Sequence, residues 1–244
     1  MHSSTASFNP WRLGLPVAAL LAAGFLLRTV EEGLASPAVW RGEQLVALAG
    51  RGGLASALGG LRAVVAGSYW LRANAAWEDR DAAAMESLIN LTVAADERPL
   101  YFWLNGARML AYDVPSWQPG DAPIVIGRHV NEEQAHRALR FLDKGLNWHG
   151  VDAELYVEIA NIHLRQLGDL ESAARYYRLA AREPGAPYYA ARIHAELLRA
   201  LGRPHEALNW LQQILPGLPG DDPAARREWV RARIQALERE LSGH

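Results

Sequence analysis

The chain has 244 residues, of which half are apolar and 9% are aromatic, and its formal net charge is −2. This charge gives no global positive field that would favour nucleic acid as a partner. The chain contains no cysteine, which excludes disulfides, thiolate metal sites, cysteine nucleophiles and covalent haem attachment. Lys144 is the only lysine in the sequence, and this preference for arginine, with abundant Ala, Gly and Leu, suggests a bacterial genome rich in G and C.

The amino-terminal part holds one candidate membrane segment. Residues 1–9 are polar, and we expect them to be disordered. The apolar span over residues 10–30, with Trp11 as an interfacial anchor, approaches the ~20 residues that cross a bilayer. We expect a transmembrane helix here, and a cleaved signal peptide is the competing interpretation. The slight excess of positive charge before the span predicts a single-pass protein of the bacterial cytoplasmic (inner) membrane, with its soluble part in the periplasm.

A linker and the first helices follow. Residues 31–59 are rich in Gly and Ala, and we expect them to be a linker. Apolar residues then recur at helical spacing over residues 60–220, which predicts helical repeats. The first pair of helices is expected over residues 60–79 and 81–93, and Asp81 is placed to cap the second of them.

The next pair of helices is expected over residues 101–112 and 132–147, with a long insertion between them. This insertion, residues 114–131, is rich in Pro and Gly and contains the apolar run 124–126. Long loops in compact domains are often functional. We expect a surface loop whose apolar run either packs back on the helices or adds to a strand of a partner.

The strongest pattern lies between residues 153 and 220, where several residues are identical to those 34 positions further along the chain. In each copy an apolar helix ends at a glycine, Gly168 or Gly202, which can adopt the left-handed conformation that ends helices. A fixed period of this size is typical of stacked helical repeats. The identical pairs are Ile159 and Ile193, Leu164 and Leu198, Arg165 and Arg199, Leu167 and Leu201, Gly168 and Gly202, and Ala173 and Ala207.

This pattern resembles the tetratricopeptide repeat (TPR) family. The chain departs from the family at His163, where the family usually has Tyr, and in a turn one residue longer and a second helix one residue shorter. The resemblance implies an all-α fold, an α-solenoid of antiparallel helix pairs. With the apolar span of residues 10–30, the expected fold class is this solenoid preceded by one transmembrane helix. It also implies that proteins or peptides bind in a groove, and the alternative is an ordinary helical bundle with a chance period. The matching residues are Tyr156, Ile159, Ala160, Gly168, Ala173, Tyr177, Ala180 and Pro184.

The last segment, residues 221–244, is predicted to be a capping helix. Asp222 and Pro223 are typical of a helix start, and an apolar stripe that includes Trp229 and Ile234 follows. Such a helix covers the open end of a solenoid. A coiled-coil partner helix is the alternative.

The sequence contains no recognisable catalytic constellation. The histidines, for example His129 and His136, lack the spacing of metal ligands, and no Gly-x-Ser-x-Gly motif occurs. Pairs of carboxylates lie at expected helix starts or in loops, where the helix dipole explains them. We therefore expect neither an enzyme, nor a metal site, nor a cofactor.

Candidate binding residues follow from the TPR resemblance, because the first helix of each pair lines the concave face in that family. Arg165 and Arg199 stand one period apart, so that two aligned guanidinium groups could hold a carboxylate; that both are merely solvated is the alternative. The Lys and Asn pair with which some members hold a chain-terminal carboxylate is absent. The expected groove residues are Glu154, Val157, Asn161, Arg165, Tyr188 and Arg199.

Taken together, these patterns predict a membrane-anchored scaffold for protein–protein interactions, an accessory subunit of a bacterial envelope assembly. Its expected partners are proteins of that assembly and the membrane itself, with no nucleic acid and no small-molecule cofactor. The alternative is a periplasmic glycan- or lipid-handling protein that uses the aromatic residues of the early repeats. Those residues are Tyr69, Trp70, Trp77, Tyr101, Phe102 and Trp103.

Overall fold

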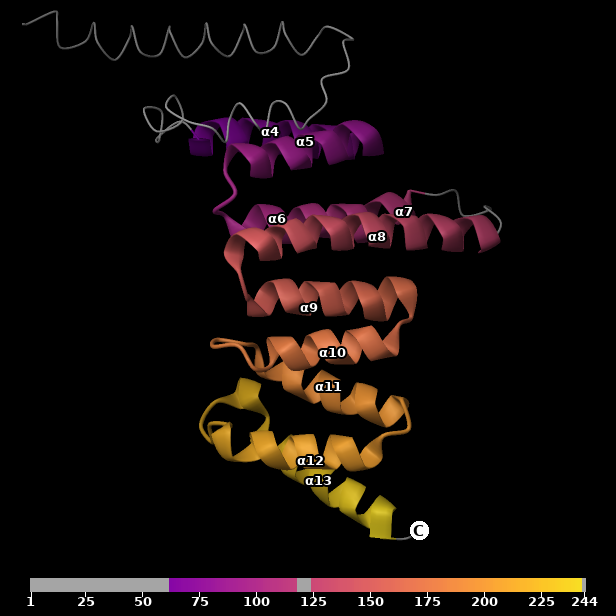
Figure 1. Cartoon of the computed structure of the whole chain (residues 1–244), viewed down its shortest axis with the longest axis vertical. Helices are drawn as coiled ribbons and strands as arrows, with labels where there is room; N and C mark the ends of the chain where they lie inside the picture. Colours follow the sequence, from indigo (N-terminus) through magenta and orange to yellow (C-terminus); the bar gives the residue numbers. More distant parts are fainter. Residues whose placement is uncertain (1–61, 118–123, 243–244) are drawn as a thin grey trace, which may run out of the picture. The chain divides into compact units, whose positions relative to one another are not determined.

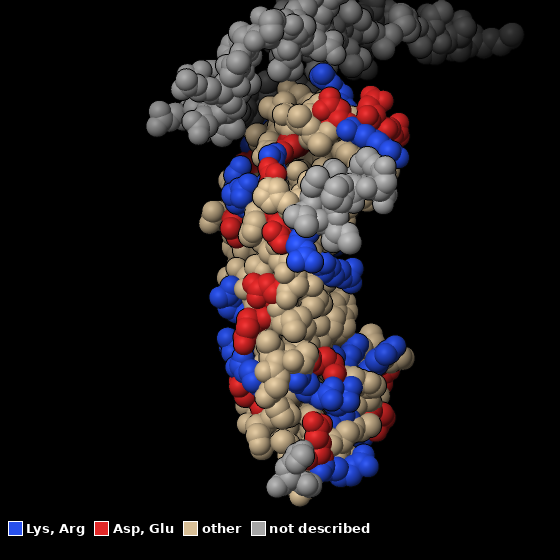
Figure 2. All heavy atoms as spheres, turned by 90° about the vertical axis from the view of Figure 1, so that its right-hand side faces the viewer, with Lys and Arg blue, Asp and Glu red and all other residues tan. Residues whose placement is uncertain are grey.

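The computed structural model describes residues 62–117 and 124–242, and every regular element within these ranges is a helix (Figure 1). The all-α class expected from the sequence is therefore confirmed for this part of the chain. The helices follow one another in chain order, and each packs against the next. On the face drawn in Figure 2, Lys and Arg side chains are interspersed with Asp and Glu side chains. Their bounds are α4 (Arg62–Glu78), α5 (Ala82–Ala95), α6 (Leu100–Arg108), η1 (Met109–Asp113), α7 (Val114–Ser116), α8 (Ile124–His149), α9 (Ala153–Ile162), η2 (His163–Leu167), α10 (Leu170–Ala180), α11 (Tyr188–Ala200), α12 (Pro204–Ile214), η3 (Leu215–Gly217), η4 (Pro223–Ala225) and α13 (Arg227–Ser242).

The transmembrane helix that formed part of the expected fold class is not supported, and we correct the fold class in this respect. Within residues 62–117 and 124–242, no helix is both long enough and apolar enough to cross a bilayer. The longest of these helices, α8, has 26 residues but carries charged side chains, among them Glu132, Arg137 and Asp143, which are costly to place in hydrocarbon. Residues 1–59, with the expected membrane segment and linker, lie outside the described residues.

Neighbouring helices pack in pairs, α4 with α5, α6 with α8, α9 with α10, and α11 with α12. The turns inside three of these pairs, α4 with α5, α9 with α10 and α11 with α12, are tight because one residue in each adopts the left-handed conformation. These residues are Arg80 (φ 57°), Gly168 (φ 64°) and Gly202 (φ 74°). The predicted left-handed Gly168 is confirmed, and so is the cap at Asp81, whose carboxylate accepts a hydrogen bond from the Ala84 amide at 3.0 Å.

The region expected to be an inserted loop, residues 114–131, differs from that expectation because much of it is helical. The helix that begins at Leu100 continues through Ser116, and α8 already begins at Ile124. The helix widens into the π turn η1 just before Pro115, a residue that cannot donate a backbone hydrogen bond to the preceding turn. Only residues 118–123, which lie outside the described ranges, separate the two helices.

Three clusters of buried side chains hold the helices together. In chain order, the first cluster extends from α4 to α9 around Ile89 and is the largest of the three. The second extends from α9 to α11 around Tyr177, and the third from α11 to α13 around Leu211. A small residue sets the closest approach in the first cluster, since a Cβ added at Gly106 would lie 2.6 Å from Cγ2 of Ile89. The first and third clusters are separate, and the cluster around Tyr177 lies between them along the chain.

The carboxyl-terminal helix α13 packs on α12 and buries Val230, Ile234 and Leu237. Its apolar stripe therefore covers the last pair, as a capping helix does, and is not free for the helix of another chain. Its start differs from the expected residue 221. Asp222 caps the short turn η4 instead, and Arg226 breaks the helical path with a left-handed conformation (φ 47°) before α13 begins.

Candidate functional site

The described residues contain a nearly buried carboxylate, that of Glu158 on α9. Its side chain is only 3% exposed, and Arg108 at the end of α6 is its partner. Nε of Arg108 donates a hydrogen bond of 2.9 Å to Oε2 of Glu158, and Nη2 lies at the same distance from the same oxygen. Because an unpaired buried charge is costly, the pair fixes Arg108 over α9 while half of the arginine side chain stays in contact with water.

The hydroxyl of Tyr112 lies beside this ion pair. The atom is buried and makes no hydrogen bond of standard geometry. Burial, and secondly the negative charge of Glu158, raise the pKa of Tyr112. A hydrogen bond to Glu158 contributes to the same rise in pKa, so the hydroxyl points towards this carboxylate although the geometry of the bond is not ideal.

Both π turns of the described chain border this place. The turn η1 carries Tyr112, and the turn η2, in the helix that starts with α9, carries Arg165. A π turn accommodates one extra residue in a helix and occurs frequently at functional sites. The turn η2 ends at Leu167, directly before the left-handed Gly168.

Asn161 and Tyr177 connect the site to the second helix of the pair. The Tyr177 hydroxyl on α10 donates a hydrogen bond of 2.6 Å to Oδ1 of Asn161 on α9. The ring of Tyr177 is buried, and burial raises the pKa of this tyrosine to about 12. The positive charge of Arg165 acts in the opposite direction on the same pKa.

Tyr189 on α11 adds an exposed aromatic ring to the site. Its side chain is 43% exposed. Burial of the rest of the residue raises the pKa of Tyr189, and the charge of Glu158 raises it further, while Arg108 and Arg165 act against this shift. Tyr189 therefore lies near residues of α6, α9 and η2. We define the central cluster as Arg108, Tyr112, Glu158, Asn161, Arg165, Tyr177 and Tyr189.

The central cluster is rich in hydrogen-bond donors. The charge of Glu158 is balanced by Arg108, so Arg165 remains as an exposed cation that has no ion pair among the described residues. The hydroxyl of Tyr112 is buried against Glu158, so it faces this carboxylate and not a ligand. A surplus of donors together with an exposed ring suits a ligand that offers acceptor oxygens and apolar surface.

The structure brings together part of the predicted groove. Asn161 and Arg165 belong to the central cluster, and Glu154 is an exposed neighbour whose charge also acts on Tyr189. Val157 is buried and packs in the core around Tyr177. Its side chain is therefore not exposed to a ligand.

The other two predicted groove residues have different surroundings. Tyr188 is half-buried against the carboxyl-terminal core. Nη1 of Arg199 lies 2.7 Å from Oε2 of Glu196, whose other oxygen lies 2.7 Å from Nε of Arg233 on α13. No described contact joins Arg165 to Arg199, so the shared carboxylate site of these two arginines stays a prediction.

Sequence reasoning missed Arg108, Tyr112, Glu158 and Tyr189. One signal was present, because Glu158 is a charged residue inside the apolar run from Leu155 to Ile162. A buried acid at such a place requires a cation nearby. The partner could not be found in the sequence, since 50 residues separate it from Glu158.

The aromatic residues of the first described helices do not form a single platform. Trp103 is buried, and its Nε1 donates a hydrogen bond to the Glu97 carbonyl at 2.8 Å. The rings of Trp70, Tyr101 and Phe102 contact one another with centroids 5.3 to 5.8 Å apart. Of these three, Tyr101 keeps 57% of its surface exposed.

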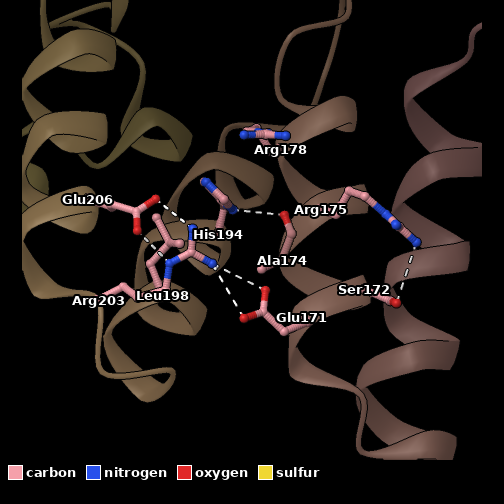
Figure 3. Close-up of a pocket in the computed structure, with 9 residues that line it drawn as sticks. All are labelled: Glu171, Ser172, Ala174, Arg175, Arg178, His194, Leu198, Arg203 and Glu206. Carbon is pink, nitrogen blue, oxygen red and sulfur yellow. Dashed lines mark hydrogen bonds and ion pairs between the residues drawn. The ribbon is translucent and has the colours of Figure 1, made fainter.

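A small cavity of about 270 Å³ lies between α10, α11 and α12 on the side of the second helices (Figure 3). Arg203 crosses it, with Nη2 2.6 Å from Glu206 and Nη1 3.2 Å from Glu171. His194 is buried there, and its Nδ1 donates a hydrogen bond of 2.8 Å to the Ala174 carbonyl. Burial lowers the pKa of His194 to about 4, so the ring is neutral at pH 7. These contacts join three helices, and we assign them a structural role.

Within residues 62–117 and 124–242, no group of three metal-binding side chains lies close enough to hold an ion. His163, a departure from the TPR pattern, stacks on Tyr176 with ring centroids 5.5 Å apart, and its Nδ1 lies 3.3 Å from Asp169. No protein-family model matches the chain. No curated protein matches it either.

Proposed function

We propose that the chain is a protein-interaction scaffold that binds an acidic peptide segment at the central cluster. The observation that supports this proposal is the arrangement of exposed Arg165 and Tyr189 beside the ion pair of Arg108 and Glu158. The ion pair holds Arg108 in place before any ligand arrives, which lowers the entropy cost of binding. Membership of the TPR family and a place in a bacterial envelope assembly stay predictions.

Charge favours an acidic segment over a basic one. Arg165 offers a guanidinium group that can hold a carboxylate with two parallel hydrogen bonds. A basic segment would find the main acid of the cluster, Glu158, already paired and almost fully buried. Glu154 is exposed at the start of α9. Its negative charge would repel acidic residues of the peptide, so we expect those residues to lie away from that end of the helix.

A binding role suits the titrating groups better than a catalytic one. The raised pKa of Tyr112 keeps its hydroxyl protonated near pH 7, so it can donate a hydrogen bond but is a poor nucleophile. Glu158 is saturated by Arg108 at one oxygen and is almost closed off from water. We therefore propose recognition without turnover.

The proposal is tested with the full chain and two fluorescent peptides of equal length, one rich in Asp and Glu and one with Asn and Gln in their place. We expect fluorescence polarisation to show binding of the acidic peptide that falls as salt is raised. Arg165→Ala should weaken it about fivefold or more, because one charged hydrogen-bond partner is lost. The matched control is Arg178→Ala, an exposed arginine on α10 that lines the cavity of Figure 3.

The same variants are then compared in crosslinked affinity capture from the cells that produce the chain. A stoichiometric protein retained by the native chain and by Arg178→Ala, but lost in Arg165→Ala and Tyr189→Ala, would support the scaffold. The scaffold proposal would be contradicted if the two peptides bound equally and if Arg165→Ala and Tyr189→Ala retained the captured protein as the native chain does.

The contact of Trp70, Tyr101 and Phe102 favours a second candidate, a glycan- or lipid-binding role for the early helices. Exposed aromatic rings stack on sugars and pack on acyl chains because they join a large apolar surface to a polar edge. A shift of tryptophan fluorescence with glycan or lipid, lost in Tyr101→Ala and unaffected by Arg165→Ala, would support this alternative. The absence of any shift would eliminate it.

A further inference from the structure

A second cavity, of about 680 Å³, lies between the loop before α11, the first turn of α11 and the turn η4. Its volume is within the range of about 300 to 1,000 Å³ that is typical of small-molecule sites. No aspartate or glutamate lines it. The lining residues are Gly185, Ala186, Pro187, Tyr188, Tyr189, Arg192, Ala224 and Arg226.

Arg192 is held in position at the edge of this cavity. Its Nη1 donates hydrogen bonds to the carbonyls of Ala224 at 3.0 Å and Ala225 at 3.1 Å, which ties α11 to η4. Burial lowers the pKa of Arg192, and the nearby positive charge of Arg226 lowers it further. Both arginines line the same cavity, and their like charges repel one another.

Arg226 reaches the cavity from a backbone conformation that is uncommon for its residue type. Its φ is 47°, a left-handed value that a residue with a Cβ adopts at a cost. Its side chain is exposed and forms no ion pair with any residue of the ranges 62–117 and 124–242. Two like charges without a neutralising acid create a local positive field. A bound anion would neutralise these charges and remove their mutual repulsion.

The rest of the lining indicates what accompanies the anionic group. Tyr189 is 43% exposed and Tyr188 half-buried, so both offer ring surface near the arginines. The cavity is also much larger than a single water or a small inorganic ion requires. A ligand that joins an anionic group to an organic body would use both features.

We propose that this cavity binds a phosphomonoester, with the phosphoryl group between Arg192 and Arg226. A phosphoryl group carries a charge of about −1.5 to −2 near pH 7, which balances two guanidinium groups, whereas one carboxylate balances only one. Arginine suits this group because its N–H fork matches the geometry of two phosphoryl oxygens. Tyr188 and Tyr189 contact the organic body.

This site is independent of the proposed acidic-peptide site, although Tyr189 borders both. The phosphoryl group has two possible sources, a small phosphorylated metabolite or a phosphorylated side chain of a protein. Both offer the same chemistry to the two arginines. The test therefore begins with small probes and then separates the sources.

Isothermal titration calorimetry of the full chain, in buffer without phosphate, would compare phenyl phosphate, inorganic phosphate and benzoate. The variant Arg226→Gly removes one guanidinium group and suits the left-handed backbone, since Gly adopts positive φ freely. The matched control is Arg80→Gly, which makes the same change at the other left-handed arginine, in the turn between α4 and α5. Arg226→Lys tests whether a point charge is sufficient.

We expect phenyl phosphate to bind more tightly than inorganic phosphate and benzoate, and Arg226→Gly to weaken it about tenfold or more. Arg80→Gly should bind as the native chain does, and Arg226→Lys should lie between. No binding of phenyl phosphate at millimolar concentration, equal binding of benzoate, or equal losses in the two Gly variants would overturn the proposal.

The source is separated by a phosphotyrosine peptide and ribose 5-phosphate. Tighter binding of the peptide would assign the phosphoryl group to a protein partner, and tighter binding of the sugar phosphate would assign it to a metabolite. In either case Arg226→Gly must remove the preference over the unphosphorylated peptide or sugar, and failure to do so would count against the site. The acidic-peptide test with Arg165→Ala is read separately, so that either proposal can fail alone.

Discussion

Arg108 and Glu158 are joined across 50 residues of sequence, with Nε and Nη2 of the arginine each 2.9 Å from one carboxylate oxygen. Arg108→Ala leaves a buried carboxylate without its cation. Breaking a fully buried pair costs about 3 to 5 kcal/mol. Because half of the arginine side chain is exposed and water can reach the pair, we expect a loss of about 2 kcal/mol in the free energy of unfolding, measured with urea.

Two further variants test the cause of that loss. Glu158→Gln removes the charge and keeps the shape, so it should cost less than Arg108→Ala. Arg231→Ala, which breaks the exposed pair with Glu228 on α13, should cost less than about 0.5 kcal/mol. A loss for Arg108→Ala no larger than that of Arg231→Ala would show that the buried pair does not stabilise the fold.

Gly106 marks the closest approach of α6 to its neighbours. An added Cβ would lie 2.6 Å from Cγ2 of Ile89 and 3.1 Å from Cε1 of Phe141. Gly106→Ala should therefore destabilise the chain by about 1 to 3 kcal/mol through overpacking. Gly67→Ala, in α4 and with no atom within 4 Å of the new Cβ, should stabilise it by about 0.5 to 1 kcal/mol. Thermal unfolding of both variants would reveal opposite shifts of Tm, and shifts of the same sign would refute the packing argument.

His194 predicts a dependence of stability on pH. Its pKa is lowered by burial to about 4 in the folded chain, from an ordinary value of 6.5. Between these values the unfolded chain binds the proton and the folded chain does not, so the stability that His194 contributes is complete above pH 6.5 and is lost as the pH falls towards 4. The loss is about 3 kcal/mol if the whole shift is realised.

The measurement is urea unfolding at several values of pH between 4 and 7, for the native chain and for His194→Asn. Asn keeps a donor near the position of Nδ1, which bonds to the Ala174 carbonyl. The variant should be less stable at pH 7 because a cavity is left, but its stability should depend less on pH. A dependence on pH identical to that of the native chain would show that other groups cause it.

We expect a small gain in stability when Arg80 or Arg226 is replaced by glycine. Both have positive φ, 57° and 47°. A left-handed conformation costs a residue with a Cβ about 1 to 2 kcal/mol, which substitution by Gly would relieve. Part of this gain in stability is offset because Gly has more conformational freedom in the unfolded chain. We expect Arg80→Gly and Arg226→Gly each to raise stability by about 0.5 kcal/mol, measured by chemical unfolding. A clear loss in both would indicate that the two arginine side chains stabilise their turns.

The local elements of this protein are determined by its sequence. The period of apolar residues predicted the helices between residues 60 and 220, and Asp81 and Gly168 marked turns that the structure confirms. These features are readable because helix hydrogen bonds and caps join residues only a few positions apart. The start of α8 was missed because the Pro and Gly residues before it resemble a loop.

The candidate sites are decided by the tertiary structure. Asn161 and Arg165 could be predicted from the repeat pattern, but the stacking of helices decided that Arg108 and Tyr189 join them. The pairing of Arg192 with the carbonyls of Ala224 and Ala225 depends in the same way on how the turn η4, between α12 and α13, packs back on α11. These hydrogen bonds join residues 32 to 50 positions apart. The angles and offsets between packed helices, which side-chain packing sets, decide which of these residues meet.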